Sequence, residues 1–199
     1  MKTERRTIKK VSVFCASSEQ AGPQYIKAAR ELGKILAENG ISFVYGGGSV
    51  GLMGHLADSA LSHKGNIIGV IPKFMVDLEW AHPGVKNMII VDTMHERKKH
   101  MLDESDAVIA LPGGSGTLDE LLEAITFKRL GLYLNPIIIV NTDHFFDQLI
   151  GMFARCVTDR FMDPRHLNMW SVAQSPHDVL ALIQNAPHWG KDAVEYAAI

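Results

Sequence analysis

The chain has 199 residues, and its composition, 47% hydrophobic and 21% charged, is typical of a globular protein. Its formal net charge of −2 argues against the basic surface that sequence-independent nucleic-acid binding requires. Two widely separated cysteines, Cys15 and Cys156, indicate neither a disulfide framework nor a zinc site, and no apolar segment is long enough to cross a membrane. We therefore expect a cytoplasmic protein with no nucleic-acid or membrane partner.

Short apolar runs rich in β-branched residues alternate along the chain with segments of helical periodicity. The pattern predicts strands over residues 11–15, 42–45, 66–71, 88–91, 107–111 and 136–140, apolar on both faces as buried parallel strands are. It predicts helices over residues 23–39, 52–63, 94–102, 117–130 and 144–159, and a last helix after Ser175-Pro176. This order is typical of a Rossmann-like α/β fold, a doubly wound, mainly parallel sheet flanked by helices. We expect residues 1–199 to form a single nucleotide-binding domain with short flexible termini, the second beginning at Asn185.

A first glycine-rich segment, Gly46-Gly47-Gly48-Ser49-Val50-Gly51, follows a predicted strand and precedes a predicted helix. Glycines let the backbone approach an anion, and the N–H groups and dipole of a helix start attract phosphate. The segment fits G-x-G-x-x-G, but NAD is disfavoured because Ile71 runs into Pro72 and Lys73, where an acidic residue would hold the ribose. A tight turn without a ligand is the alternative.

A second segment, Pro112-Gly113-Gly114-Ser115-Gly116-Thr117, also follows a strand and precedes a helix. Two such turns at the carboxyl ends of parallel strands face one crevice, which predicts a shared phosphate and sugar site. Thr117 and Glu120 also have the spacing of a capping box, so a helix cap is the alternative to a catalytic Glu120. Glu123 lies on the same side of the predicted helix and is the reserve carboxylate.

A cationic helix start follows the fourth predicted strand. Thr93 and Glu96 have capping-box spacing, which places Arg97, Lys98 and Lys99 in or near the first turn. Each cation there opposes the helix dipole by a few tenths to about 1 kcal/mol, so a bound anion would explain the cluster. A solvated basic face is the alternative.

Three motifs, G-G-G-x-x-G-L-M-G, M-H-E-R-K and P-G-G-x-G-T-x-x-E, in this order and at these separations, resemble those of the LOG (Lonely Guy) family. These are cytokinin riboside 5′-monophosphate phosphoribohydrolases, many of which have carried the label lysine decarboxylase. The resemblance covers residues 11–149 and implies a Rossmann-like enzyme, dimeric or larger, that releases base and ribose 5-phosphate from a nucleoside monophosphate.

The resemblance also implies roles for individual residues. Arg97 and Glu120 would be the catalytic pair, and Lys98 would help bind the substrate. Glu79, Thr126 and the backbone of Gly113, Gly114, Ser115, Gly116 and Thr117 would contact it too, and we expect further contacts from Ser18, Gly47, Gly48 and Met94. Two departures put part of the fit in doubt: Ala16 stands where the family usually has glycine before a serine pair, and Ser115 replaces a frequent tyrosine.

The chemistry of an N-glycoside agrees with this residue set. Its cleavage develops positive charge on the ribose and negative charge on the base, and Glu120 suits the stabilisation of the first. Arg97 suits either the phosphate or the leaving base, and no metal or cofactor is required. Two alternatives stay open: a nucleotide-binding or carrier protein without chemistry, and a pyridoxal phosphate decarboxylase, for which we find no convincing lysine.

Two properties of the protein stay open at the level of sequence. The preferred base is adenine or an N6-prenylated adenine. The helix predicted over residues 117–130 is apolar at Leu121, Leu122, Ile125, Phe127 and Leu130, wider than one core stripe needs, which favours a homodimer or higher homo-oligomer. A helix buried on two sides is the alternative.

Overall fold

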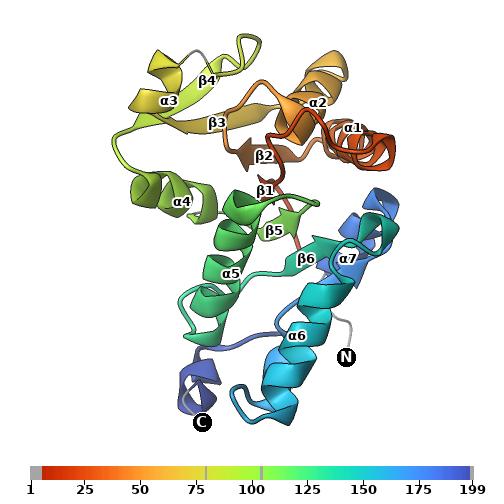
Figure 1. Ribbon diagram of the computed structural model, residues 1–199, viewed down its shortest axis with the longest axis vertical. Coiled ribbons are helices and arrows are strands. Elements are labelled where there is room, and N and C mark those ends of the chain that lie inside the picture. The colour runs from red at the N-terminus through yellow and green to blue at the C-terminus, as the bar shows by residue number, and fades with distance from the viewer. Residues whose placement is uncertain (1–5, 79, 104, 198–199) are drawn as a thin grey trace.

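The computed structural model describes residues 6–78, 80–103 and 105–197. Within these ranges seven strands form one sheet in the order β4-β3-β2-β1-β5-β6-β7, and every neighbouring pair is parallel. Figure 1 shows this order running from β4 at the top of the view to β6 below its middle. The strands are β1 (Lys10–Phe14), β2 (Ser42–Tyr45), β3 (Ile67–Pro72), β4 (Asn87–Val91), β5 (Ala107–Ala110), β6 (Ile137–Val140) and β7 (Ser171–Ala173).

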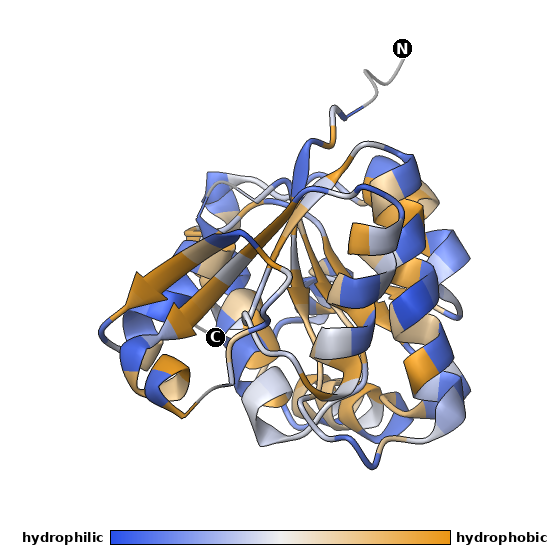
Figure 2. Ribbon diagram, turned by 90° about the horizontal axis from the view of Figure 1, so that it is seen from above, coloured by the Kyte–Doolittle hydropathy of each residue, from blue (hydrophilic) through white to orange (hydrophobic). Residues whose placement is uncertain are grey.

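Helices cover both faces of the sheet. They are α1 (Pro23–Glu38), α2 (Gly51–Ser62), α3 (Lys73–Asp77), α4 (Met94–Leu102), α5 (Ser115–Arg129), α6 (Asp147–Thr158) and α7 (Val179–Asn185). Apolar residues of α1, α2 and α7 form one core with the sheet, whereas those of α4, α5 and α6 form a second core on the opposite face. Figure 2 shows the largely apolar strands between helices whose outward turns are hydrophilic. The predicted α/β Rossmann-like fold is therefore confirmed.

The structure differs from the predicted elements in a few places. The strand β7 and the helix α3 are short, three and five residues, and neither was predicted. The prediction that every strand is buried on both faces is wrong for β4, because it lies at the edge of the sheet and leaves Ile90 57% exposed. The described helices contain none that is both long and apolar enough to cross a membrane.

The C-terminal segment packs against the end of α5 instead of extending as a flexible tail. Trp189 is buried and its Nε1 donates a hydrogen bond of 2.7 Å to the Lys128 carbonyl. A 3₁₀ helix, Lys191–Tyr196, follows, and Ala193 within it is fully buried. The described part of this segment, up to residue 197, is thus part of the packed structure.

The strand order reverses between β1 and β5. From β1 the chain moves outward through β2, β3 and β4, and β5 then returns to the other side of β1, where Phe14 pairs with Ala110. Connections that leave neighbouring strands in opposite directions open a crevice at their carboxyl ends, the usual ligand site of open α/β sheets. Both glycine-rich segments follow strands at this edge.

Candidate active site

The N-terminal cap of α4 sets the position of Arg97. Thr93 Oγ1 accepts a hydrogen bond of 3.1 Å from the Glu96 N–H, and Glu96 Oε2 accepts one of 2.9 Å from the Asp92 N–H. The predicted cap at Thr93 is confirmed. It starts the helix so that Arg97, in the first turn, faces inward and is only 7% exposed, while Lys99 is exposed.

The guanidinium of Arg97 is held on all three nitrogens. Nη1 donates to Glu120 Oε1 at 2.7 Å, Nε donates to the Val70 carbonyl at 3.1 Å, and Nη2 donates to the Gly46 carbonyl at 3.3 Å. A Cβ atom at Gly46 would lie 1.9 Å from Nη2, so the guanidinium reaches this position only because residue 46 is glycine. Glycine here makes room for an arginine.

Glu120 lies in the second turn of α5 and does not cap it. The alternative interpretation, a Thr117–Glu120 capping box, is wrong, because α5 begins at Ser115 with Gly114 as its N-cap. Thr117 instead packs over Gly113, where a Cβ atom would lie 2.1 Å from its Oγ1. Glu120 is 7% exposed and bound to Arg97. Burial raises the pKa of Glu120, and the charge of Arg97 opposes that rise.

The pair sits at the point where the strand order reverses. Arg97 reaches the ends of β2 and β3 through its carbonyl contacts, and α5, which carries Glu120, follows β5 directly. Cys15, the residue after β1, is buried, and burial together with the negative charge of Glu120 raises the pKa of its thiol. A neutral thiol beside the pair leaves Glu120 as the group able to carry negative charge there.

The N-terminus of α5 is suited to an anion. The first N–H groups of a helix have no intrahelical acceptor, and they carry the positive end of its dipole. Gly114, Ser115 and Gly116 are exposed, and a Cβ atom at either glycine would have no neighbour within 4 Å. The backbone at the start of α5, one to two turns before Glu120, is therefore accessible to a ligand.

Other predicted site residues lie in varied surroundings. Lys98 is 11% exposed, and its Nζ lies 3.0 Å from Asp119 Oδ2 and 3.2 Å from Glu123 Oε2, so it joins α4 to α5. The Thr126 hydroxyl donates to the Leu122 carbonyl of its own helix. Ser18 and Met94 are exposed. Glu79 lies outside the described residues, and the substrate contacts expected of all five stay predictions.

The first glycine segment has structural roles that the sequence did not reveal. Gly47 and Gly48 are buried, and Gly47 has a φ of +76°. The Ser49 N–H donates to the Trp80 carbonyl at 3.1 Å, and the His82 N–H donates to the Gly47 carbonyl at 2.9 Å. These hydrogen bonds join backbone atoms of residues more than thirty positions apart, so no sequence motif reveals them. Substrate binding by Gly47 and Gly48 stays a prediction.

A cavity of about 680 Å³ lies between α4 and α5. Lys99 and Leu102 line it from α4, Glu123 and Phe127 line it from α5, and Tyr133 closes it beyond α5. Neither Arg97 nor Glu120 lines it, so the cavity is separate from the ion pair, although Glu123 also faces Lys98.

The sequence is similar to a known protein family and to several named plant proteins. Residues 53–183 match a family model described as "Possible lysine decarboxylase". A probable cytokinin riboside 5′-monophosphate phosphoribohydrolase of Oryza sativa subsp. japonica is 39% identical over 90% of this chain and 79% of its own. A cytokinin riboside 5′-monophosphate phosphoribohydrolase of Arabidopsis thaliana is 42% identical over 82% of this chain and 76% of its own.

Solved structures of similar fold carry other names. The molybdenum cofactor binding protein of Rippkaea orientalis is 26% identical, with a TM-score of 0.68 over 89% of this chain and 96% of its own. The molybdenum cofactor carrier protein of Chlamydomonas reinhardtii is 20% identical, with a TM-score of 0.69 over 90% of this chain and 98% of its own. At that identity the second likeness concerns the fold alone.

Proposed function

The chain belongs to the LOG family of cytokinin riboside 5′-monophosphate phosphoribohydrolases, and we propose that it hydrolyses the N-glycosidic bond of a purine nucleoside 5′-monophosphate. The products are the free base and ribose 5-phosphate. The observation that carries the proposal is the buried Arg97–Glu120 ion pair at 2.7 Å, at the carboxyl edge of the sheet where the strand order reverses.

The 5′-phosphate binds at the N-terminus of α5. Exposed amides at Ser115 and Gly116 and the positive end of the helix dipole favour a dianion there. Glu120 follows Ser115 by five residues on the same helix, about 7.5 Å along its axis. That separation suits a ribose 5-phosphate whose phosphate lies at the helix start and whose anomeric carbon lies by the carboxylate.

Glu120 stabilises the positive charge that develops on the ribose as the bond to the base breaks. The electrons of the C1′–N9 bond leave with the base. Water adds its hydroxyl to C1′, and the proton that it loses is balanced by the proton that the base takes up.

Arg97 favours the ionised form of Glu120 and holds the carboxylate in one orientation. Its three nitrogens already donate to Glu120, Val70 and Gly46, which leaves one N–H on each terminal nitrogen for a substrate. These contacts favour a role for Arg97 in positioning the Glu120 carboxylate over a role as the main phosphate ligand.

The base, the assembly and the location belong to the same proposal. The names of the relatives favour a substrate whose base is an N6-modified adenine, and AMP is the alternative substrate with unmodified adenine. Leu122 on α5 and Leu130 and Leu132 after it are 40%, 42% and 69% exposed, which supports a homo-oligomer formed through this region. Free thiols at Cys15 and Cys156 agree with a cytoplasmic enzyme.

A carrier without chemistry is the second candidate, favoured by the 26% identity with a molybdenum cofactor binding protein. Decarboxylation through a Schiff base is disfavoured at Lys98. Partial burial lowers the pKa of Lys98, but hydrogen bonds from its amine to Asp119 and Glu123 raise it overall, whereas a Schiff-base lysine must lose its proton.

Incubation of the pure protein with AMP, and separately with isopentenyladenosine monophosphate, followed by chromatography, tests the proposal. We expect free base and ribose 5-phosphate in equal amounts from at least one of the two. Tight retention of the nucleotide without release of ribose 5-phosphate supports the carrier instead.

A further inference from the structure

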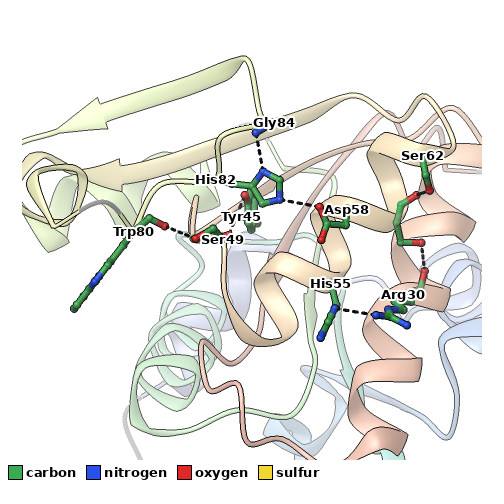
Figure 3. Close-up of polar contacts among 11 residues, drawn as sticks. Arg30, Tyr45, Ser49, His55, Asp58, Ser62, Trp80, His82 and Gly84 are labelled. Atoms are coloured by element: carbon green, nitrogen blue, oxygen red, sulfur yellow. Dashed lines mark hydrogen bonds and ion pairs between the residues drawn. The ribbon is translucent and has the colours of Figure 1, made fainter.

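The loop of Trp80, Ala81, His82, Pro83 and Gly84, called here the 80–84 loop, is fastened to the first glycine segment. Gly48 and Ala81 form an antiparallel bridge, with the Ser49 N–H bonded to the Trp80 carbonyl on one side and the His82 N–H bonded to the Gly47 carbonyl on the other. Ser49 Oγ adds a bond of 3.3 Å to the Trp80 carbonyl. Figure 3 shows Trp80 pointing away from this junction, while His82 lies over it.

The imidazole of His82 is fixed by partners on both nitrogens. Nδ1 accepts a hydrogen bond of 3.1 Å from the Gly84 N–H, so the ring proton lies on Nε2, which is 3.2 Å from Asp58 Oδ1 on α2. Figure 3 shows the ring between these two partners. The 80–84 loop is thereby tied to α2, the helix that the glycine segment itself begins.

The His82–Asp58 contact adds little to stability. The Asp58 side chain is 70% exposed whereas that of His82 is 6% exposed, and solvent screening weakens a pair with one exposed partner. A hydrophobic side chain in place of the buried imidazole would avoid the cost of burying a polar ring. The contact is therefore better explained by the geometry that it imposes than by the energy that it supplies.

That geometry leads to the active-site pair. The backbone N–H of His82 donates to the carbonyl of Gly47, and the adjacent carbonyl of Gly46 is one of the three acceptors that hold Arg97. The Tyr45 hydroxyl donates to the Gly48 carbonyl at 3.2 Å and holds the same segment from beneath. We infer that His82, anchored by Asp58, is a positioning residue for the hydrolysis: it fixes the glycine segment, which fixes Arg97 and through it Glu120. This inference rests on the proposed function.

Five variants test the inference: Asp58→Ala, His82→Phe, the double variant, His82→Gln, and Glu38→Ala, which removes a half-exposed carboxylate at the far end of α1 as the control. Release of ribose 5-phosphate gives kcat and KM, and amide hydrogen exchange follows residues 46–49. Because Asp58 is exposed, its variant is expected to fold even if His82→Phe does not.

We expect kcat to fall roughly tenfold to a hundredfold in His82→Phe, and less in Asp58→Ala, because a displacement of about 1 Å at the reacting groups costs that much. KM stays within threefold, since the phosphate binds at α5. The double variant is no worse than His82→Phe, exchange at residues 46–49 accelerates, and His82→Gln, which restores a donor to Asp58, recovers part of kcat.

An unchanged kcat per folded molecule in both single variants, or an equal loss in Glu38→Ala, overturns the inference. So does a rise in KM at constant kcat. These outcomes require that the wild type releases ribose 5-phosphate; if it does not, the proposed function fails, and unchanged exchange at residues 46–49 in Asp58→Ala then overturns the anchoring independently.

Discussion

Arg97 and Glu120 are each almost fully buried, which strengthens their attraction but removes their charges from water. Two charges removed from water lose several kcal/mol of hydration each, which their attraction repays only with good geometry. The 2.7 Å contact and the two carbonyl acceptors on Arg97 supply that geometry. Loss of one partner leaves the other charge buried and uncompensated, so each residue depends on the other for stability as well as for activity.

As the proposed catalytic carboxylate, Glu120 is expected to set the acid side of the pH profile. Burial raises the pKa of Glu120 above its ordinary 4.5, and the reaction needs the ionised form, so kcat/KM is expected to fall with decreasing pH at a value above 4.5. In Arg97→Gln the residual activity should fall at a still higher pH, because the charge of Arg97, which keeps the pKa of Glu120 lower, is removed. Arg97→Lys keeps a positive charge and should shift the fall less. Rates measured from pH 4 to 8 check this, and an acid side that is identical in all three proteins would argue against Glu120 as the titrating group.

Gly46 is expected to matter for catalysis more than for folding. An alanine there places Cβ 1.9 Å from Arg97 Nη2 and displaces the guanidinium, so kcat should fall at least roughly tenfold. Gly151→Ala is the matched control, because a Cβ atom there has no neighbour within 4 Å and an exposed helix interior gains about 0.5–1 kcal/mol from alanine. Steady-state kinetics and urea unfolding measure the two effects. Full activity in Gly46→Ala would show that the Arg97 position is not needed.

Helix α5 contributes different features at different turns. Its first turn offers amides to a phosphate, its second turn carries Glu120, and its last turn carries Lys128, which is 2% exposed and donates 2.7 Å to the Asn135 carbonyl. The C-terminal segment closes over that last turn through Trp189. Displacement of the helix as a unit would therefore change the site and the packing together.

Lys128 makes the stability of this helix depend on pH. Burial, with a smaller effect from Arg6, lowers the pKa of Lys128 to about 7, whereas the unfolded chain keeps the ordinary 10.5. Between these values the unfolded state binds more protons, so the free energy of unfolding rises with pH by up to about 1.4 kcal/mol per unit, and this gain is lost as pH falls through about 7. Urea unfolding at pH 7 and pH 9 should show the rise in the wild type and in Lys27→Met, an exposed control, and a smaller one in Lys128→Met. Equal rises in all three would contradict it.

Elements with strong periodicity were predictable from sequence, and contacts between backbone groups were not. The six predicted strands and the cap at Thr93 follow from apolar runs and side-chain spacing. The alternative of a Thr117–Glu120 cap is wrong because the helix starts two residues earlier, and the carboxylate in its second turn bonds a buried arginine instead of a backbone amide. The partners of the glycine segment, Trp80 and His82, lie more than thirty residues away and bond through their main chain, which no motif records.

At the scale of the whole molecule, exposed leucines lie on and just after α5. Leu122 and Leu132 are 40% and 69% exposed near the cavity between α4 and α5, which leaves apolar area that a second copy would cover.

Light scattering after size exclusion should give at least twice the 22.0 kDa mass of one chain. The double substitution Leu122→Glu with Leu132→Glu should give a monomer, because two buried charges oppose association. Met152→Glu, at a residue 61% exposed on α6, is the matched control and should leave the mass unchanged. A wild-type protein that elutes as a monomer, or dissociation by the control alone, would contradict assembly through α5.

The central claim is that Glu120, held by Arg97, cleaves the N-glycosidic bond of a nucleotide whose phosphate lies elsewhere on α5. The most direct test measures ribose 5-phosphate release and equilibrium nucleotide binding on the same folded samples of the wild type and Glu120→Gln. We expect release to fall at least roughly a hundredfold in Glu120→Gln, with the Kd changed less than threefold, because only the charge in the transition state is lost. Release that survives in Glu120→Gln at the wild-type rate would contradict the account.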